Sequence, residues 1–298
     1  IRYIMIPATE FSISPARECF HLHLRPEDIA DTVILVGDPE RVDMFREFCE
    51  HIEFEKQARE FHTLTGIFYG KRLTVLSTGI GTDNIDIAVT ELDGLANIDF
   101  DTHEPRKEHR SLNLLRIGTS GSIQPDLPVG CYVFSHYAIG LDNVLHYYAD
   151  CPKVCEESIA ESFLAQVAWN PNLHRPYAVK CSDSLAAAFE QWAIPGVTLS
   201  SSGFYGPQGR SVRTGIAMPH MLDDFENFRW NDTAGKSWRI TNFEMESSVL
   251  YGLGRILGHN VGTVCSCIGN RHNKATNLDY HSLIRTLVEK SLHTLAAL

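Results

Sequence analysis

VILVGDPER, residues 33–41, is an apolar run that ends at a glycine and leads at once into a proline and an arginine. LSTGIG (residues 76–81) and LLRIGTSG (residues 114–121) repeat this arrangement. A glycine-rich turn after a strand exposes backbone N–H groups, and a following helix adds the positive end of its dipole. One such turn is ordinary in α/β proteins. Three of them, with Arg41 and Arg116 supplied from within, predict a site for a phosphate-sized anion.

Apolar runs of strand length alternate with segments of helical periodicity along the rest of the chain. The runs are residues 33–36, 73–76, 114–117, 131–139, 177–181 and 261–268, and the helical segments are 84–96, 156–169, 244–257 and 281–298. Near-continuous apolar strands between helices are typical of a sheet covered on both faces. We predict an α/β fold in which residues 1–298 form a single domain with a central mixed, partly closed β-sheet flanked by helices; an open parallel sheet is the alternative.

The composition excludes several classes of protein. The net charge of -11 argues against a nucleic-acid partner, because neutralising phosphates needs an excess of Lys and Arg. The eight cysteines form no CxxC pair, which indicates reduced thiols rather than a disulfide framework. No apolar stretch reaches the ~18 residues of a membrane span, and the first residues lack a signal-peptide core. We therefore expect a cytoplasmic protein without a membrane partner.

Three segments lie outside the regular pattern. Residues 1–18 are interpreted as an N-terminal extension, and residues 99–113 and 142–153 as insertions. The first insertion contains two histidines and three basic residues, which could contact a polyanion. We interpret it as a solvated loop, since charge runs usually face water.

Eight short motifs occur in a characteristic order. They are FHL (20–22), GDPER (37–41), REF (59–61), STGIG (77–81), RIGTSG (116–121), GFYGPQGR (203–210), NFEMES (242–247) and NR (270–271). This ordered set resembles the nucleoside phosphorylases of the hexameric purine/uridine type, and among them most closely the uridine phosphorylases. The resemblance covers roughly residues 19–298. It implies a pentosyltransferase that needs no cofactor and uses inorganic phosphate as co-substrate.

Phosphate binding is predicted at the glycine-rich turns. Arg41, Arg116, the Gly37 turn and Thr119 offer charge-assisted donors that match a phosphate. The resemblance adds Arg59, whose counterpart in the family reaches into the neighbouring subunit's site. It therefore implies a homodimer as the smallest active unit and leaves a hexamer open.

Ribose binding is predicted at residues 244–246. Taken alone, Glu244, Met245 and Glu246 fit an ordinary helix N-terminus, and two carboxylates two residues apart do not share a helix face. The resemblance instead implies that Met245 and Glu246 hold the ribose hydroxyls. It also implies that His21 reaches the ribose 5′-hydroxyl from across the dimer.

The predicted base pocket consists of Phe204, Gln208, Arg210, Arg271, Ser120 and Gly121. Phe204 can stack on a heterocycle, and the Gln208 amide offers a donor and an acceptor that suit the edge of uracil. Arg210 and Arg271 can stabilise the negative charge that develops on the leaving base. We assign the catalytic roles to Arg210, Gln208 and Arg116.

The lack of an acidic residue at positions 268–271 indicates which base the substrate carries. Purine-cleaving relatives carry an Asp about two dozen residues beyond the ribose-binding glutamate, whereas residues 268–271 here read IGNR. This favours phosphorolysis of uridine to uracil and ribose 1-phosphate. A purine nucleoside phosphorylase or nucleosidase on the same fold, and a catalytically silent nucleoside-binding protein, remain as alternatives.

Two positions depart from the bacterial uridine phosphorylases. Gly209 stands where those relatives have Glu, and Asn84 stands where they have a Ser that helps bind a monovalent cation between subunits. Glu60 and Ile80 match the other ligands of that cation. The sequence leaves open whether Glu60, Ile80 and Asn84 form a cation site.

Overall fold

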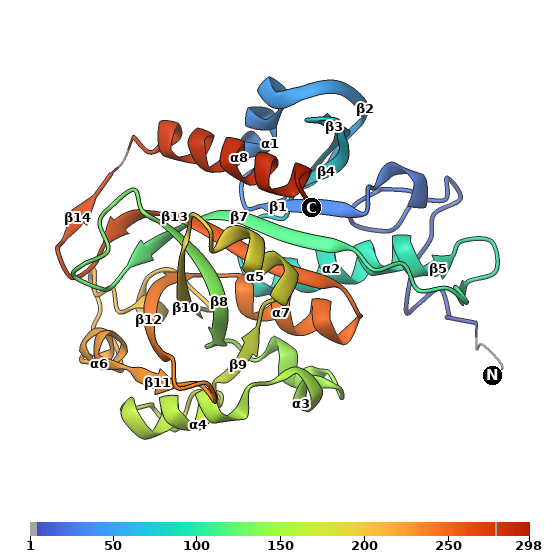
Figure 1. The fold of residues 1–298 in the computed structure, drawn as a ribbon. Helices are drawn as coiled ribbons and strands as arrows, with labels where there is room; N and C mark the ends of the chain where they lie inside the picture. The colour runs from blue at the N-terminus through green and yellow to red at the C-terminus, as the bar shows by residue number, and fades with distance from the viewer. Residues whose placement is uncertain (1–4, 278) are drawn as a thin grey trace.

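The computed structural model describes residues 5–277 and 279–298, and its core is a twelve-stranded mixed sheet (Figure 1). The strands are β1 (Thr32–Val36), β2 (Cys49–Ala58), β3 (Phe61–Phe68), β4 (Lys71–Ser77), β7 (Asn113–Ser122), β8 (Tyr132–Gly140), β9 (Tyr177–Lys180), β10 (Ile194–Ser200), β11 (Arg229–Asn231), β12 (Ser237–Glu244), β13 (Asn260–Asn270) and β14 (Ala275–Thr276). β5 (Ile98–Asp99) and β6 (Glu104–Pro105) form a separate pair.

The sheet closes on itself at one end. The strand order is β11-β12-β10-β8-β13-β7-β1-β4-β3-β2, and β12 also pairs with β7. That last pairing joins β7, β13, β8, β10 and β12 into a ring, because Phe243 of β12 lies opposite Gly121 of β7. The predicted mixed, partly closed sheet is therefore confirmed.

Helices cover both faces of the sheet. They are α1 (Pro39–Met44), α2 (Thr82–Asn97), α3 (Cys151–Val154), α4 (Glu157–Gln166), α5 (Asp183–Phe189), α6 (Met221–Asn227), α7 (Ser247–Ile256) and α8 (His281–Ala296), with 3-10 turns η1 (Pro26–Asp28), η2 (Phe45–Phe48), η3 (Val144–Tyr147) and η4 (Gly206–Gln208). α8 lies on one side of β1 and β7, and α2 and α7 lie on the other (Figure 1). None of the helices in the described ranges is long and apolar enough to cross a membrane.

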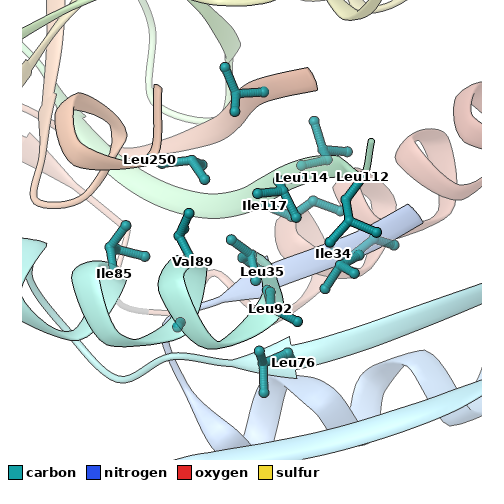
Figure 2. Packing of buried hydrophobic residues seen from close by; sticks show 14 of the residues in the cluster. Ile34, Leu35, Leu76, Ile85, Val89, Leu92, Leu112, Leu114, Ile117 and Leu250 are labelled. Atoms are coloured by element: carbon teal, nitrogen blue, oxygen red, sulfur yellow. The ribbon is translucent and has the colours of Figure 1, made fainter. Parts of the chain in front are cut away.

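The core forms where α2 packs on the central strands. Ile85, Val89 and Leu92 recur at helical spacing on α2 and face Leu35 of β1 and Ile117 of β7 (Figure 2). All five side chains are fully buried. β1 is buried along its whole length because it has a neighbour on each side and helices on both faces, as its run of β-branched residues predicts.

The structure corrects two local predictions. Residues 118–121 are not a turn before a helix, because β7 continues through them to Ser122 and pairs there with both β13 and β12. The predicted helix 244–257 starts at Ser247, since Glu244 is the last residue of β12. The first two glycine-rich turns do lead into helices, α1 and α2, as expected.

Candidate functional site

A cavity of about 940 Å³ opens where β1, β7, β12 and β13 end. Its lining includes predicted residues for phosphate (Gly37, Arg41, Arg116, Thr119), ribose (Met245, Glu246) and base (Ser120, Gly121, Phe204, Gln208, Arg210, Arg271). Glu60, Ile80 and Asn84 line the same cavity. The structure therefore brings together residues from seven separate parts of the chain.

The first glycine-rich turn presents Arg41 to the cavity from the short helix α1. Asp38 caps this helix by accepting a hydrogen bond from the Glu40 N–H at 2.9 Å, and Pro39 fits the first helical position. Arg41 makes no ion pair with any described residue, and the one hydrogen bond of its guanidinium within these residues is a 3.5 Å contact to the Ile117 carbonyl. Burial and the nearby charge of Arg116 lower the pKa of Arg41. An anion in the cavity would relieve this repulsion.

Arg116 joins the predicted phosphate and ribose sites. Its buried guanidinium pairs with Glu246 and lies 3.5 Å from the Glu244 carboxylate. Burial alone would lower the pKa of Arg116, but these two carboxylates outweigh burial and raise it. Glu246 also accepts the Gly81 N–H at 2.8 Å, so the second glycine-rich turn is held on the same carboxylate.

Glu244 and Glu246 converge on Arg116, contrary to the expectation from helical geometry. The reason is that the two residues do not share a helix: Glu244 ends β12, and the chain bends at Met245 and Glu246 before α7 begins. Glu244 in turn accepts the backbone N–H groups of Glu246 (2.9 Å) and Ser247 (3.0 Å), which begin α7. Both carboxylates line the cavity, and that of Glu244 also holds the start of the helix.

Residues 203–210, which contain the predicted base-binding residues Phe204, Gln208 and Arg210, form a tight turn around η4 that we call the base loop. Gly209 has a φ of 72°, a left-handed conformation that suits glycine, and this turn carries Gln208 and Arg210 into the cavity. Arg210 Nη1 donates to the Gln208 Oε1 and to the Phe204 carbonyl, both at 2.6 Å. Its guanidinium lies 3.8 Å from the centre of the Phe204 ring. Burial and the charge of Arg271 lower the pKa of Arg210 to about 10.

Arg271 supports this loop rather than standing free in the cavity. It donates to the carbonyls of Gln208 (2.9 Å) and Gly209 (3.4 Å). Asn270, beside it, is buried and donates to the carbonyls of Gln124 (2.8 Å) and Leu127 (2.7 Å). The side chain of Asn270 is therefore used to hold the segment after β7, and it offers no acid to a bound base.

Two predicted site residues lie outside the cavity of their own chain. His21 is tied to Glu91 of α2, through its backbone N–H at 2.9 Å and its ring Nδ1 at 2.6 Å. Arg59 has a φ of 56° and extends over the ring of Phe20, 5.9 Å from its centre. Phe20 is 55% exposed, so it forms with these two residues a surface patch whose members do not line the cavity.

Tyr280, at the start of α8, lines the cavity and was not expected from the sequence. Ala275 and Thr276 of β14 line it too. These residues follow β13 in a segment without a glycine motif. The only signal is their position between the NR motif and the last helical segment.

Glu60 and Asn84 lie together beside the second glycine-rich turn, with the Asn84 Nδ2 3.3 Å from the Glu60 Oε1. The amide is therefore arranged as a donor to the carboxylate. Rotation of the amide by 180° would present an oxygen beside the carboxylate, which is the donor set that a monovalent cation accepts.

Two other side-chain clusters have metal-ligand types, Asp93–His109–His259 and Asp43–Glu55–His62. In the first, His259 Nδ1 accepts the Leu112 N–H at 3.1 Å, so its Nε2 carries a proton and has no lone pair for a metal. In the second, Arg46 pairs with both carboxylates. His259 Nε2 lies 3.2 Å from Asp93 Oδ1, and His62 Nε2 lies 2.8 Å from Glu55 Oε1.

Residues 31–298 match the family model described as the phosphorylase superfamily. The chain is 29% identical to a uridine phosphorylase of Thermococcus kodakarensis, covering 85% of this chain and 77% of that protein. It is also 29% identical to a uridine phosphorylase of Haemophilus influenzae, with coverages of 85% and 86%. A crystal structure of a Trypanosoma brucei nucleoside phosphorylase that shows uridine phosphorylase activity superposes with a TM-score of 0.88 at 26% identity, over 97% of this chain and 100% of that one.

Proposed function

The chain belongs to the phosphorylase superfamily, and from that premise we propose that it catalyses the phosphorolysis of uridine to uracil and ribose 1-phosphate. One observation carries this proposal: a single cavity is lined by a half-buried arginine that has no ion-pair partner among the described residues, by a buried carboxylate suited to ribose hydroxyls, and by a hydrogen-bonded Gln–Arg pair. Arg41, Glu246 and the Gln208–Arg210 pair supply these three parts. The uridine phosphorylase names of two relatives support the same conclusion.

Phosphate is the nucleophile in this mechanism. Arg41 and the N–H groups around Gly37 hold it, with Thr119 and Arg116 beside them. The phosphate attacks C1′ of the ribose as the bond to the base breaks, and its negative charge stabilises the oxocarbenium character of the sugar. Holding both reactants in one orientation supplies a large share of the rate enhancement.

Glu246 binds the ribose hydroxyls in this proposal. The Arg116 guanidinium is paired with the Glu246 carboxylate, which binds the sugar. The same guanidinium also lines the space for the phosphate. The two substrates are thus positioned against each other by a single buried ion pair. Met245 provides the apolar surface for the sugar ring.

Uracil leaves as an anion, and the base loop stabilises it. Gln208 binds the O2/N3 edge, and Arg210 stabilises the charge that develops on the ring. Fixed donors of this kind lower a barrier by about 3–4 kcal/mol each, so a general acid is not required. Arg271 acts through the carbonyls of Gln208 and Gly209 that it holds.

The active unit in this proposal is a homodimer. His21 and Arg59 lie with the exposed Phe20 on one surface patch, which supports their delivery to the partner's cavity. The eight cysteines are unpaired, which supports a reducing, cytoplasmic location. Glu60, Asn84 and the Ile80 carbonyl are the residues that would hold a monovalent cation there. That cation would have a structural role between subunits.

The test is absorbance-monitored cleavage of uridine, thymidine and inosine, each with and without inorganic phosphate. We expect uridine cleavage that depends on phosphate. Cleavage of inosine in preference to uridine would contradict the role given to Gln208 and Arg210. Cleavage without phosphate would indicate a nucleosidase, and binding of uridine without cleavage would indicate a silent nucleoside-binding protein.

A further inference from the structure

A second cavity, of about 660 Å³, lies behind the base loop. Phe204 and Gln208 line the active-site cavity, whereas Tyr205 and the start of η4 line the second one. Arg210 lines both. Residues 204–210 are therefore a thin wall with a cavity on each side, and one guanidinium is accessible from both.

The second cavity is apolar with a positive charge at one place. Leu141, Trp169, Ile216 and Met218 contribute its apolar surface. Arg210 and Arg213 also line it, and no acidic side chain does so among the described residues. The positive charge is local, because the whole chain carries a net charge of -11. This combination fits a ligand with an apolar body and one anionic group.

We propose that this cavity binds a small aromatic organic acid, a carboxylate or sulfonate on a planar ring system. The ring packs against Trp169 and Met218, and the anionic group pairs with Arg213 and Arg210. The site is separate from the space for nucleoside and phosphate, because Trp169, Met218 and Arg213 do not line the active-site cavity.

Binding at this site changes base recognition through Arg210, and this part of the inference rests on the proposed function. In the ligand-free chain Arg210 Nη1 is held at 2.6 Å by both Gln208 Oε1 and the Phe204 carbonyl. An anion in the second cavity competes for that guanidinium. Gln208 then loses the contact that orients it, and the leaving uracil loses its nearest cation. We expect a higher KM for uridine and a lower kcat, with the KM for phosphate unchanged.

The probe for the test is 8-anilinonaphthalene-1-sulfonate, which has an aromatic body and one sulfonate. Its binding is measured by its own fluorescence and by the quenching of Trp169, one of four tryptophans, with Trp169→Phe to assign the signal. We expect one probe per chain. Arg213→Gln should weaken binding about tenfold, the value of one charge-assisted hydrogen bond, and should leave activity without the probe unchanged. Arg17→Gln, at a distant exposed arginine, is the matched control.

A second variant fills the cavity. Gly215 lines the cavity, and a Cβ added there would meet no atom within 4 Å, so Gly215→Trp introduces a large side chain at the cavity wall from an unobstructed Cβ. We expect it to abolish probe binding and inhibition while uridine cleavage continues. The inference is overturned if phosphate alone displaces the probe, if Arg213→Gln and Gly215→Trp bind it like the parent chain, or if a second copy of the chain covers the cavity in solution. Because probe binding is measured without turnover, its loss is distinguished from failure of the proposed reaction.

Discussion

Gly118→Ala tests whether the buried Arg116 ion pair holds the site together. A Cβ at Gly118 would lie 2.1 Å from Arg116 Nη1 and 2.8 Å from its Cζ. Real Cβ contacts are essentially never below 3.0 Å, so the guanidinium has to move by about 1 Å. That displacement separates Arg116 from Glu246, with which it is paired in the folded chain.

The size of the effect follows from that displacement. Overpacking a buried site costs about 1–3 kcal/mol, and a hydrogen bond between charged groups contributes about 1.5–3 kcal/mol. Because Glu244 remains as a counter-charge 3.5 Å away, we expect the lower part of the combined range, about 2.5–4 kcal/mol. At about 2 °C per kcal/mol for a chain of this size, the Tm should fall by about 5–8 °C.

Thermal melting and steady-state kinetics measure the two consequences. We expect kcat/KM for phosphate to fall about a hundredfold, since one charge-assisted contact is misplaced. Gly121→Ala on the same strand is the control for stability, because its Cβ would meet no atom within 4 Å. If Gly118→Ala melts and turns over like the parent chain, Arg116 does not have the role assigned to it.

Three further predictions concern groups around the cavity and beneath it. Burial raises the pKa of Asp142 above 3.8, so its stabilising contribution is present at low pH and is lost as the pH rises through the folded-state pKa. Chemical unfolding from about pH 4 to pH 7 should show the parent chain losing stability relative to Asp142→Asn, and a constant difference would contradict this sign. His62→Leu removes a 3.3 Å contact with the Pro39 carbonyl at the start of α1, so the KM for phosphate should rise several-fold while that for uridine stays the same. Arg271→Met frees the Gln208 carbonyl, and the KM for uridine should rise about tenfold; an equal rise in the KM for phosphate would refute this division of roles.

Much of the architecture was predictable because it depends on local patterns. The run at residues 33–36 is a central strand, and the helical periodicity of 84–96 identifies α2 within two residues at its start. Strands β2, β3, β10 and β12 were not predicted. In the case of β2 the reason is that the strand is largely exposed and lacks an apolar run. The glycines at 118 and 121 indicated a turn. Pairing with β13 and β12 keeps them in a strand, and a single stretch of sequence does not reveal those partners.

The sequence motifs predicted most of the residues that line the cavity, but only part of the contacts among them. The motifs identified Arg41, Glu246 and Arg210 as neighbours, and the structure brings them to one cavity. The motifs gave no sign that Arg271 holds the base loop by its carbonyls, since backbone acceptors leave no trace in side-chain identity. Tyr280 was missed for a similar reason, because its place at the cavity depends on how the segment after β13 folds back.

One part of the site lies on the sheet and another on a loop, and this division determines how substrate preference can change. Arg116, Thr119 and Ser120 lie on β7, a strand paired on both sides, whereas Gln208 and Arg210 belong to a turn outside the sheet whose carbonyls accept hydrogen bonds from Arg271. Replacing residues 203–217 as one cassette would therefore leave the phosphate chemistry intact while altering the base that is recognised. New nucleoside specificities on this scaffold should accumulate in that cassette, and β7 should tolerate few changes.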